Sequence, residues 1–310
     1  MHNVLLLETI APDAVQMLEQ HTQLLKASSP FTGLEIAEKH PIHAIVTRGK
    51  GDVSKALIAA CPDLQVIARC GVGLDNVDVA FASQQGVKVI NAPGINADTV
   101  AEQTLALMLS LQRKLYTAIL EVKNGNWEAR KQYSGDEIRG KTLGILGMGN
   151  IGQKVAKLAT AFGMKVIYWE IEDKKIEYEY KDFETVLRES NIVSLHLPLV
   201  EATHNLINQD ALSLMQSSCL LINTARGGLI EQQSLYQALK DEKIGGFAAD
   251  VLAAEPPAQD ELLLQLENVL ITPHTASLTA LTYNEMCVLT VENAINLLAG
   301  KKIEERFLFN

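Results

Sequence analysis

The sequence lacks several features that would assign it to a specialised class of protein. Among its 310 residues there is no run of about 18 consecutive apolar residues, so no membrane-spanning helix is expected. The four cysteines have no CxxC spacing, which argues against a disulfide framework. They are expected to be buried free thiols in a reducing compartment, the cytoplasm, and no metal site is expected.

Positive charge is also in the minority. The chain has 27 lysines and arginines against 37 aspartates and glutamates, which gives a formal net charge of −10. A nucleic-acid-binding protein normally carries a basic face, and the sequence shows none. Nucleic acid and membrane are therefore not expected as partners, although a local site can still be positive enough to bind an anionic small molecule.

The composition is that of an ordinary soluble globular protein, with 47% apolar and 21% charged residues. The length suffices for one large domain or two ordinary ones. The first residues, MHNVLLLETIAPD, lack the basic start of a secretion signal and are expected to form a first strand.

Short aliphatic runs alternate with amphipathic stretches along nearly the whole chain. Runs of this kind, without polar alternation, are typical of parallel strands that helices cover on both faces. The alternating order predicts an α/β fold with doubly wound parallel sheets. The expected strands lie at residues 4–8, 43–47, 64–68, 87–91, 142–147, 165–170, 191–197, 219–225, 245–251 and 268–272.

These strands are too many for one comfortable sheet, so two domains are expected. A long helix from Asn96 to Lys114 is expected to carry the chain from the first domain to the second, and a helical stretch after Ser277 is expected to bring it back. The first domain would then be discontinuous, with residues 1–97 and 283–310, and the second would comprise residues 98–282.

The strongest local signal is the segment LGILGMGNIG, in which Gly147, Gly149 and Gly152 form a GxGxxG pattern between a strand and a helix. The first glycine allows a tight turn, the second a close approach of a pyrophosphate, and the third close packing of helix and strand. The N–H groups at the start of the helix would bind the phosphates. Two further residues of this turn, Asn150 and Ile151, are expected to contact the same dinucleotide.

An acidic residue, Glu170, ends the strand that follows the glycine-rich turn. A carboxylate at this point is expected to bind the ribose hydroxyls of a dinucleotide. Glu172 and Asp173 add negative charge that would repel a 2′-phosphate, so the sequence favours NAD over NADP. Lys174 and Lys175 keep NADP open as an alternative.

Three polar residues follow later strands: Arg226 in ARGG, Glu255 in DVLAAEPP and His274 in TPHTAS. Taken one at a time, they would fit a surface charge, a solvated loop residue and a structural histidine. Because reactions in such sheets occur beyond the carboxyl ends of the strands, we expect these side chains to gather at one edge. A guanidinium, a carboxylate and an imidazole together favour hydride transfer involving a small 2-oxo acid.

Each of these groups has a definite task in that reaction. The imidazole of His274 suits proton transfer, because the ordinary pKa of histidine is about 6.5. The carboxylate of Glu255 would fix the histidine tautomer through the far ring nitrogen. The guanidinium of Arg226 would bind the substrate carboxylate and stabilise charge on the carbonyl oxygen.

Seven separated motifs resemble those of the D-isomer-specific 2-hydroxyacid dehydrogenase family and cover nearly the whole chain. They are GVGLDNVD, NAPGINADTVAE, GKTLGILGMGNIG, HLPL, NTARGG, AADVLAAEPP and TPHTAS. The resemblance implies a Rossmann-type NAD domain inserted in a flavodoxin-like substrate domain. It also implies that Arg226 binds substrate, Glu255 tunes the imidazole and His274 is the acid–base catalyst.

The resemblance extends to further cofactor contacts. It implies that Asp250 lies against the nicotinamide carboxamide and that Pro198 lies near the adenosine half of NAD. Thr224 and Ala225, directly before Arg226, are expected to complete the cofactor site.

The resemblance also implies the substrate contacts of the first domain. The amides of Val72 and Gly73 would receive the substrate carboxylate as an anion nest. Arg48 and Asn96 would line the same cleft, and Lys50 would meet a distal group of the substrate. Without the resemblance, an ordinary turn, a helix cap and surface charges would explain these residues equally well.

Within the family, the segment VKNGNWEARKQYSGDEIRGKTLGILG is most similar to the phosphoglycerate dehydrogenase branch. This implies D-3-phosphoglycerate and 3-phosphohydroxypyruvate as the substrate pair, the first step of serine biosynthesis. The phosphate would meet Lys50, Arg130 or Lys131, the last two from a neighbouring subunit. The sequence departs from the branch at Gly49, where many relatives carry a hydroxyl residue, and at Glu170, where aspartate is commoner. No C-terminal regulatory domain is expected after Asn310.

Alternative functions stay open at this point. A glyoxylate/hydroxypyruvate reductase or a D-lactate-type dehydrogenase would have the same motifs with a different substrate. A non-catalytic NAD-sensing protein would have the same fold and the same three residues. Members of the family are usually dimers or tetramers, so a homodimer or homotetramer through the cofactor domain is expected.

Overall fold

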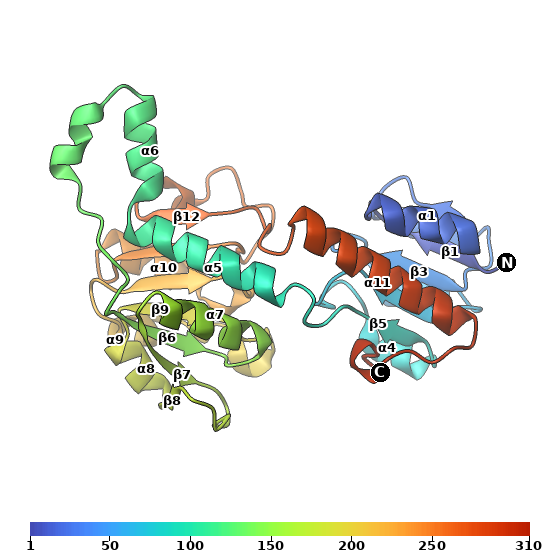
Figure 1. The fold of residues 1–310 in the computed structure, drawn as a ribbon. Coiled ribbons are helices and arrows are strands. Elements are labelled where there is room, and N and C mark those ends of the chain that lie inside the picture. Colours follow the sequence, from blue (N-terminus) through green and yellow to red (C-terminus); the bar gives the residue numbers. More distant parts are fainter. The chain divides into compact units, whose positions relative to one another are not determined.

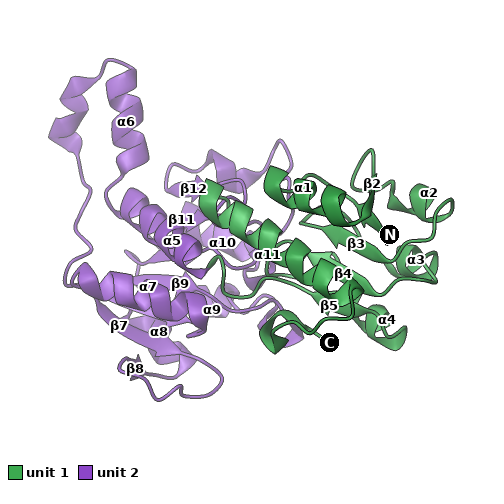
Figure 2. Ribbon diagram, turned by 45° about the vertical axis from the view of Figure 1, so that its right-hand side comes forward, with its two compact units in different colours: residues 1–96, 278–310 green, residues 97–277 purple.

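The computed structural model describes residues 1–310, which form two compact units (Figures 1 and 2). Unit 1 comprises Met1–Asn96 and Leu278–Asn310, and unit 2 comprises Ala97–Ser277. The chain therefore returns to unit 1 after it has completed unit 2. The sequence-based boundaries follow residues 97 and 282, whereas the structure divides after Asn96 and Ser277.

Unit 1 contains a five-stranded parallel sheet in the order β2-β1-β3-β4-β5, which is the flavodoxin-like order. Its strands are β1 (Asn3–Leu6), β2 (Gln23–Lys26), β3 (Ala44–Thr47), β4 (Val66–Arg69) and β5 (Lys88–Ile90). Its helices are α1 (Pro12–His21), α2 (Gly33–Ala37), α3 (Lys55–Ala59), α4 (Val79–Gln84), α11 (Ala280–Leu298) and the short 3-10 helix η5 (Glu305–Phe307).

Helices cover both faces of this sheet because successive residues of each strand point to opposite sides. In β1, Val4 and Leu6 pack in the core under α1 and α11, whereas Leu5 packs in the core under α2, α3 and α4. An alternating polar pattern is therefore absent from β1, as the aliphatic run predicts for a strand between two helical layers.

Unit 2 contains a seven-stranded parallel sheet in the order β12-β11-β10-β9-β6-β7-β8. Its first strand in sequence is central, and the chain winds outward from it in both directions, as in Rossmann folds. Its strands are β6 (Thr142–Leu146), β7 (Lys165–Trp169), β8 (Glu179–Tyr180), β9 (Ile192–Leu195), β10 (Leu220–Asn223), β11 (Gly246–Ala249) and β12 (Val269–Ile271). The predicted class, two doubly wound parallel-sheet units, is confirmed.

The helices of unit 2 lie in two layers. One core lies between the sheet and α5 and α7, and a second core lies under α8, α9 and α10. The helices are α5 (Ala97–Gln112), α6 (Leu115–Lys123), α7 (Asn150–Ala161), α8 (Phe183–Glu189), α9 (Gln209–Leu214) and α10 (Gln232–Lys240). The 3-10 helices are η1 (Trp127–Gln132), η2 (Glu201–Thr203), η3 (Gly227–Leu229) and η4 (Leu262–Gln265).

The structure corrects the expected helix from Asn96 to Lys114. Helix α5 ends at Gln112, and Lys114 adopts a left-handed conformation with φ of 48°, which breaks the helix before α6 begins. Helices α6 and η1 then extend from the rest of unit 2 as an arm (Figure 1). None of the residues in these two helices is buried.

Three strands at sheet edges also differ from the sequence-based expectation. Strands β2 and β8 are absent from the predicted set; both lie at an edge of their sheet and have exposed residues. Strand β12 was expected to be buried but is half-buried along its length, because it lies at the other edge of the larger sheet. All four cysteines are buried free thiols. None of the helices combines the length and apolar character needed to cross a membrane.

Candidate active site and cofactor site

The glycine-rich turn lies between β6 and α7, and packing requires two of its three glycines. Gly147 has φ of 100°, and a Cβ built there would lie 2.7 Å from the backbone carbonyl of His196. A Cβ built on Gly152 would lie 2.2 Å from the carbonyl oxygen of Gly147. Strand and helix can approach this closely only because neither residue has a side chain.

Gly149 differs from its two neighbours, because no contact within the protein requires a glycine there. Its φ of −76° suits any residue, and a Cβ built on it meets nothing within 4 Å. It is the N-cap of α7, so the open space lies at a helix N-terminus, where N–H groups attract phosphate. The turn therefore fits a dinucleotide pyrophosphate. The neighbouring Asn150 is exposed and Ile151 is half-buried.

The carboxylate of Glu170 faces this turn from the end of β7. Its Oε2 accepts a hydrogen bond of 3.1 Å from the N–H of Met148, which lies between the first two glycines. Asp173 is engaged elsewhere: it accepts hydrogen bonds from the Tyr168 hydroxyl and from the N–H of Lys175. These two donors lower the pKa of Asp173 below its ordinary value, so it is ionised at neutral pH.

The other expected cofactor residues lie beyond neighbouring strands of unit 2. Pro198 is exposed and follows β9. Thr224 follows β10 and is buried, and its hydroxyl forms a hydrogen bond of 2.8 Å with that of Thr104 on α5. The side chain of Thr224 thus joins β10 to α5, and Ala225 beside it is half-buried.

Arg226, Glu255 and His274 follow β10, β11 and β12, which are neighbours in the sheet. The Nδ1 atom of His274 lies 2.6 Å from Oε2 of Glu255, within hydrogen-bond distance. The ring of His274 is half exposed, so its Nε2 atom has room for a reacting group. A histidine held by a carboxylate through one nitrogen is suited to transfer a proton through the other.

Buried Asp250 organises the loop that carries His274. Its side chain accepts hydrogen bonds from the N–H groups of Thr275, at 2.8 Å, and Ala276, at 2.7 Å, and from the Thr272 hydroxyl, at 2.5 Å. Its carbonyl oxygen accepts from the N–H of His274. His274 itself has φ of 55°, a conformation that a non-glycine residue adopts only when its surroundings hold it there. Both carboxylate oxygens of Asp250 are thus used within the protein.

Buried Asn223, the last residue of β10, holds the turn of Arg226. Its side-chain amide donates to the carbonyl oxygen of Arg226 at 2.9 Å, and its side-chain oxygen accepts from the N–H of Ala225 at 3.0 Å. Its own carbonyl accepts from the N–H of Asp250. Asn223 is not among the site residues predicted from the sequence, where its signal is a polar amide at the end of an otherwise aliphatic strand.

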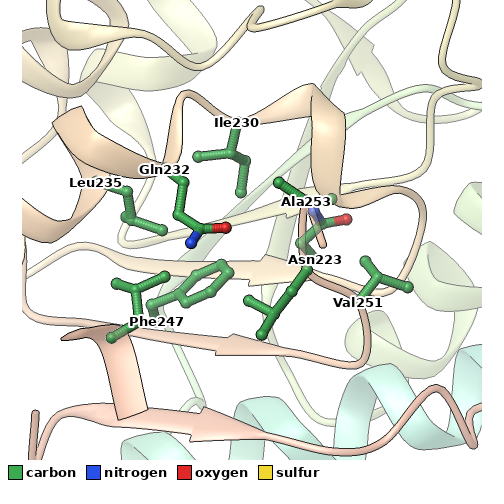
Figure 3. Close-up of a pocket in the computed structure, with 10 residues that line it drawn as sticks. Asn223, Ile230, Gln232, Leu235, Phe247, Val251 and Ala253 are labelled. Carbon is green, nitrogen blue, oxygen red and sulfur yellow. The ribbon is translucent and has the colours of Figure 1, made fainter. Parts of the chain in front are cut away.

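Gly227 joins the arginine turn to the loop of Glu255. A Cβ on Gly227 would lie 2.0 Å from the backbone carbon of Leu252, so the two loops are in direct contact. The N–H of Leu252 in turn donates to Oε1 of Glu255 at 3.1 Å. A cavity of about 10 Å³, enough for roughly one water, lies behind these loops. Asn223, Ile230, Gln232, Leu235, Phe247, Val251 and Ala253 are labelled around it in Figure 3.

In unit 1, the turn after β4 presents two free backbone N–H groups. Those of Val72 and Gly73 donate to no acceptor in the protein. The N–H of Ala92 donates to the carbonyl of Gly71 at 2.8 Å, and the side chain of Asn91 donates to the carbonyl of Val72 at 2.6 Å. Because C=O and N–H point in opposite directions across a trans peptide, these two bonds turn the free N–H groups the other way. Two neighbouring N–H groups of a turn that are free in this way are suited to bind an anion.

The remaining expected substrate residues are distributed over both units. Arg48 is half-buried, and its guanidinium lies 5.4 Å from the ring centroid of Tyr283 on α11. Lys50 is exposed, and Asn96 directly precedes α5. Arg130 and Lys131 lie in η1 of unit 2, where Lys131 forms an ion pair with Glu128. No three His, Cys, Asp or Glu side chains gather as a group that could hold a metal ion.

Comparisons with known proteins identify the family of this chain. A family model described as “D-isomer specific 2-hydroxyacid dehydrogenase, NAD binding domain” matches residues 105–276. A hydroxypyruvate reductase of Thermotoga maritima is 40% identical over 274 residues, which cover 86% of this chain and 89% of that protein. A D-3-phosphoglycerate dehydrogenase of Archaeoglobus fulgidus is 35% identical over 303 residues, which cover 96% of this chain and 57% of that protein.

A solved structure matches nearly the whole chain. The crystal structure of an NADPH-dependent glyoxylate/hydroxypyruvate reductase from Sinorhizobium meliloti has a TM-score of 0.90 and 28% identity, covering 98% of this chain and 97% of that chain. The fold and the glycine-rich turn define a dinucleotide-binding oxidoreductase. The chain belongs to the D-isomer specific 2-hydroxyacid dehydrogenase family and carries its NAD-binding domain.

The different environments of Gly149 and Gly152 allow a test of the cofactor site. We expect Gly149→Val to leave the melting temperature close to that of the wild type, because the new side chain enters open space. NADH binding, measured by fluorescence titration, should weaken by about tenfold or more, roughly 1.4 kcal/mol, because the side chain occupies the place of the pyrophosphate. Gly152→Ala should instead lower both melting temperature and binding. Wild-type affinity in Gly149→Val would contradict the assignment.

Proposed function

We propose that the protein interconverts D-3-phosphoglycerate and 3-phosphohydroxypyruvate with NAD, and that Arg226, Glu255 and His274 carry the reaction. The observation that supports catalysis most directly is the 2.6 Å contact between Nδ1 of His274 and Oε2 of Glu255, at the strand ends of an NAD-binding unit. A protein that only senses NAD would bind NADH but would turn over no 2-oxo acid, so a turnover assay separates it from this proposal.

In this proposal the residues act as follows. The glycine-rich turn and Glu170 would hold NAD, which would supply the hydride chemistry at the C2 atom of the substrate. In the direction of reduction, His274 donates a proton from Nε2 to the carbonyl oxygen, while its Nδ1–H donates to Glu255. Arg226 binds the substrate and stabilises negative charge on that oxygen. The N–H groups of Val72 and Gly73 receive the substrate carboxylate.

NAD is proposed in preference to NADP because of the acidic groups after β7. The Glu170 carboxylate faces the glycine-rich turn, where it can accept hydrogen bonds from ribose hydroxyls and repels a 2′-phosphate. Asp173 adds a second negative charge, which the Tyr168 hydroxyl holds in place. The neighbouring structure from Sinorhizobium meliloti is NADPH-dependent, so both cofactors belong in any assay.

The proton-transfer role of His274 is open to a direct test. We expect His274→Ala to bind NADH as tightly as the wild type, because the glycine-rich turn is unchanged. Turnover should fall by about 10²- to 10⁴-fold, the usual contribution of a general acid–base group. The control is His21→Ala, an exposed histidine at the end of α1, which should keep full activity. Near-normal turnover of His274→Ala would rule out the proposed catalyst.

The choice of substrate is tested by comparing kcat/KM across 2-oxo acids with NADH and with NADPH. Two exposed or half-exposed cations, Lys50 and Arg48, support a substrate with a distal phosphate. We expect 3-phosphohydroxypyruvate to exceed hydroxypyruvate and glyoxylate, and Lys50→Ala to lose about tenfold for the phosphorylated substrate alone. The second candidate is hydroxypyruvate reduction, which the relative from Thermotoga maritima favours. Equal values with and without phosphate would support that candidate.

We propose a homodimer or homotetramer in which a second copy covers the arm of α6 and η1. Apolar side chains along this arm are largely exposed: Leu115, Tyr116, Ile119, Leu120, Val122, Trp127 and Tyr133. Exposed apolar surface of this extent is typical of an interface. Ile119→Asp with Trp127→Glu should produce monomers in sedimentation experiments, whereas Phe309→Asp, at an exposed position in unit 1, should not. A wild-type protein that sediments as a monomer would contradict the proposal.

A further inference from the structure

The loop after β3, residues 48–51, is wrapped around a single carboxylate oxygen. Glu8, two residues beyond the end of β1, directs its Oε1 atom into the loop and accepts a hydrogen bond from each of four successive N–H groups. These donors are Arg48 at 2.9 Å, Gly49 at 2.7 Å, Lys50 at 2.9 Å and Gly51 at 2.8 Å. The Thr47 hydroxyl oxygen lies 3.1 Å from the same carboxylate oxygen.

This geometry makes the loop an anion nest whose anion is the side chain of Glu8. The side chain of Glu8 is 6% exposed. Burial alone would raise the pKa of Glu8, but the four backbone N–H donors together outweigh it and lower the pKa. Glu8 is therefore a charged group at neutral pH, and its charge is compensated by backbone dipoles of the loop.

The end of the loop is anchored separately, at Gly51. Its carbonyl oxygen accepts from the Thr47 hydroxyl at 2.9 Å and from the side-chain amide of Asn76 at 2.6 Å. A Cβ on Gly51 would lie 2.7 Å from Cβ of Leu7, so the loop packs directly against the end of β1. Since β1 and β3 are neighbours in the sheet, the residue after Leu7 is in reach of the loop.

Because Glu8 occupies the nest, only some groups of the loop remain available to a substrate. Its backbone N–H groups are all used by Glu8, so positive charge can come only from the side chains of Arg48 and Lys50. The other oxygen of Glu8 lies 3.8 Å from Nε of Arg48, whose guanidinium also lies over the ring of Tyr283. The position of Arg48 thus depends on the carboxylate.

We propose that Glu8 is a positioning residue for substrate recognition: the internal anion that shapes loop 48–51 and holds Arg48 and Lys50 where they meet the group of the substrate distal to its 2-oxo acid. This inference rests on the proposed function, because it needs a substrate that these cations contact. It adds a residue that does not touch the substrate and acts only through the loop.

Chemical rescue with formate tests the inference, because formate is a carboxylate small enough to enter the space that Glu8→Ala vacates. We expect Glu8→Ala to raise KM for the best 2-oxo acid by about tenfold, with kcat and NADH affinity nearly unchanged, since NADH binds unit 2. Added sodium formate should lower KM again, and sodium chloride at equal ionic strength should not. Wild type with the same formate corrects for any competition with substrate.

Two further variants keep the test decisive. Glu8→Gln retains the shape and an acceptor oxygen without the charge, so it should fold and raise KM less than Glu8→Ala does. Glu35→Ala removes an exposed carboxylate on α2 and should match the wild type in KM and in its response to formate. Unchanged KM in both Glu8 variants would overturn the inference, as would a raised KM in Glu8→Ala that formate leaves unaltered.

The melting temperature separates this inference from the proposed function. Formate should raise the melting temperature of Glu8→Ala and leave those of the wild type and Glu35→Ala unchanged, whether or not the protein turns over a substrate. If the wild type has no activity on any 2-oxo acid, the proposed function is wrong. Stabilisation of Glu8→Ala by formate would still show in that case that loop 48–51 binds a carboxylate. If formate does not raise the melting temperature of a folded Glu8→Ala variant, the inference that loop 48–51 is shaped by an internal carboxylate is wrong.

Discussion

The arrangement of the candidate active site depends on one buried carboxylate, that of Asp250. A buried charge is costly unless hydrogen bonds compensate it, and here the donors come from the backbone and hydroxyl groups of the loop that carries His274. The loop cannot relax without leaving these oxygens unsatisfied. It therefore holds His274 in a left-handed conformation, within hydrogen-bond distance of Glu255. The geometry of the candidate site is in this sense a consequence of the hydrogen bonds that Asp250 accepts.

The same physical device, backbone N–H groups that converge on an anion, recurs in both units. In two places the anion belongs to the protein: Asp250 fills the loop after β12, and Glu8 fills the loop after β3. In two others the N–H groups are open, at the turn of Val72 and Gly73 and at the N-terminus of α7. The filled nests give loops a fixed shape, and the open ones are available to ligands. This division explains how loops at the ends of strands can be rigid and still bind anions.

The sequence predicted the inner strands well because they are aliphatic throughout, as strands between two helical layers must be. It failed at the edges, since β2 and β8 carry exposed polar residues and resemble loops. It placed the end of α5 at Lys114, two residues beyond the observed end at Gln112. The glycine-rich turn could be predicted because its three glycines have a fixed spacing between a strand and a helix, and this pattern is local in sequence.

By itself, the sequence determined the alternation of the inner strands with helices, the position of the glycine-rich turn, and which polar residues follow which strands. These features follow from local periodicity and from residue types with few conformational alternatives. Only the tertiary structure decided which polar groups contact one another, because residues 8 and 51, or 250 and 276, meet through strand order and loop packing. The hydrogen bonds of Glu8, of Asn223 and of both carboxylate oxygens of Asp250 are therefore visible only in the tertiary structure. A hydrogen bond between residues that are distant in sequence does not produce a periodic pattern from which it could be predicted.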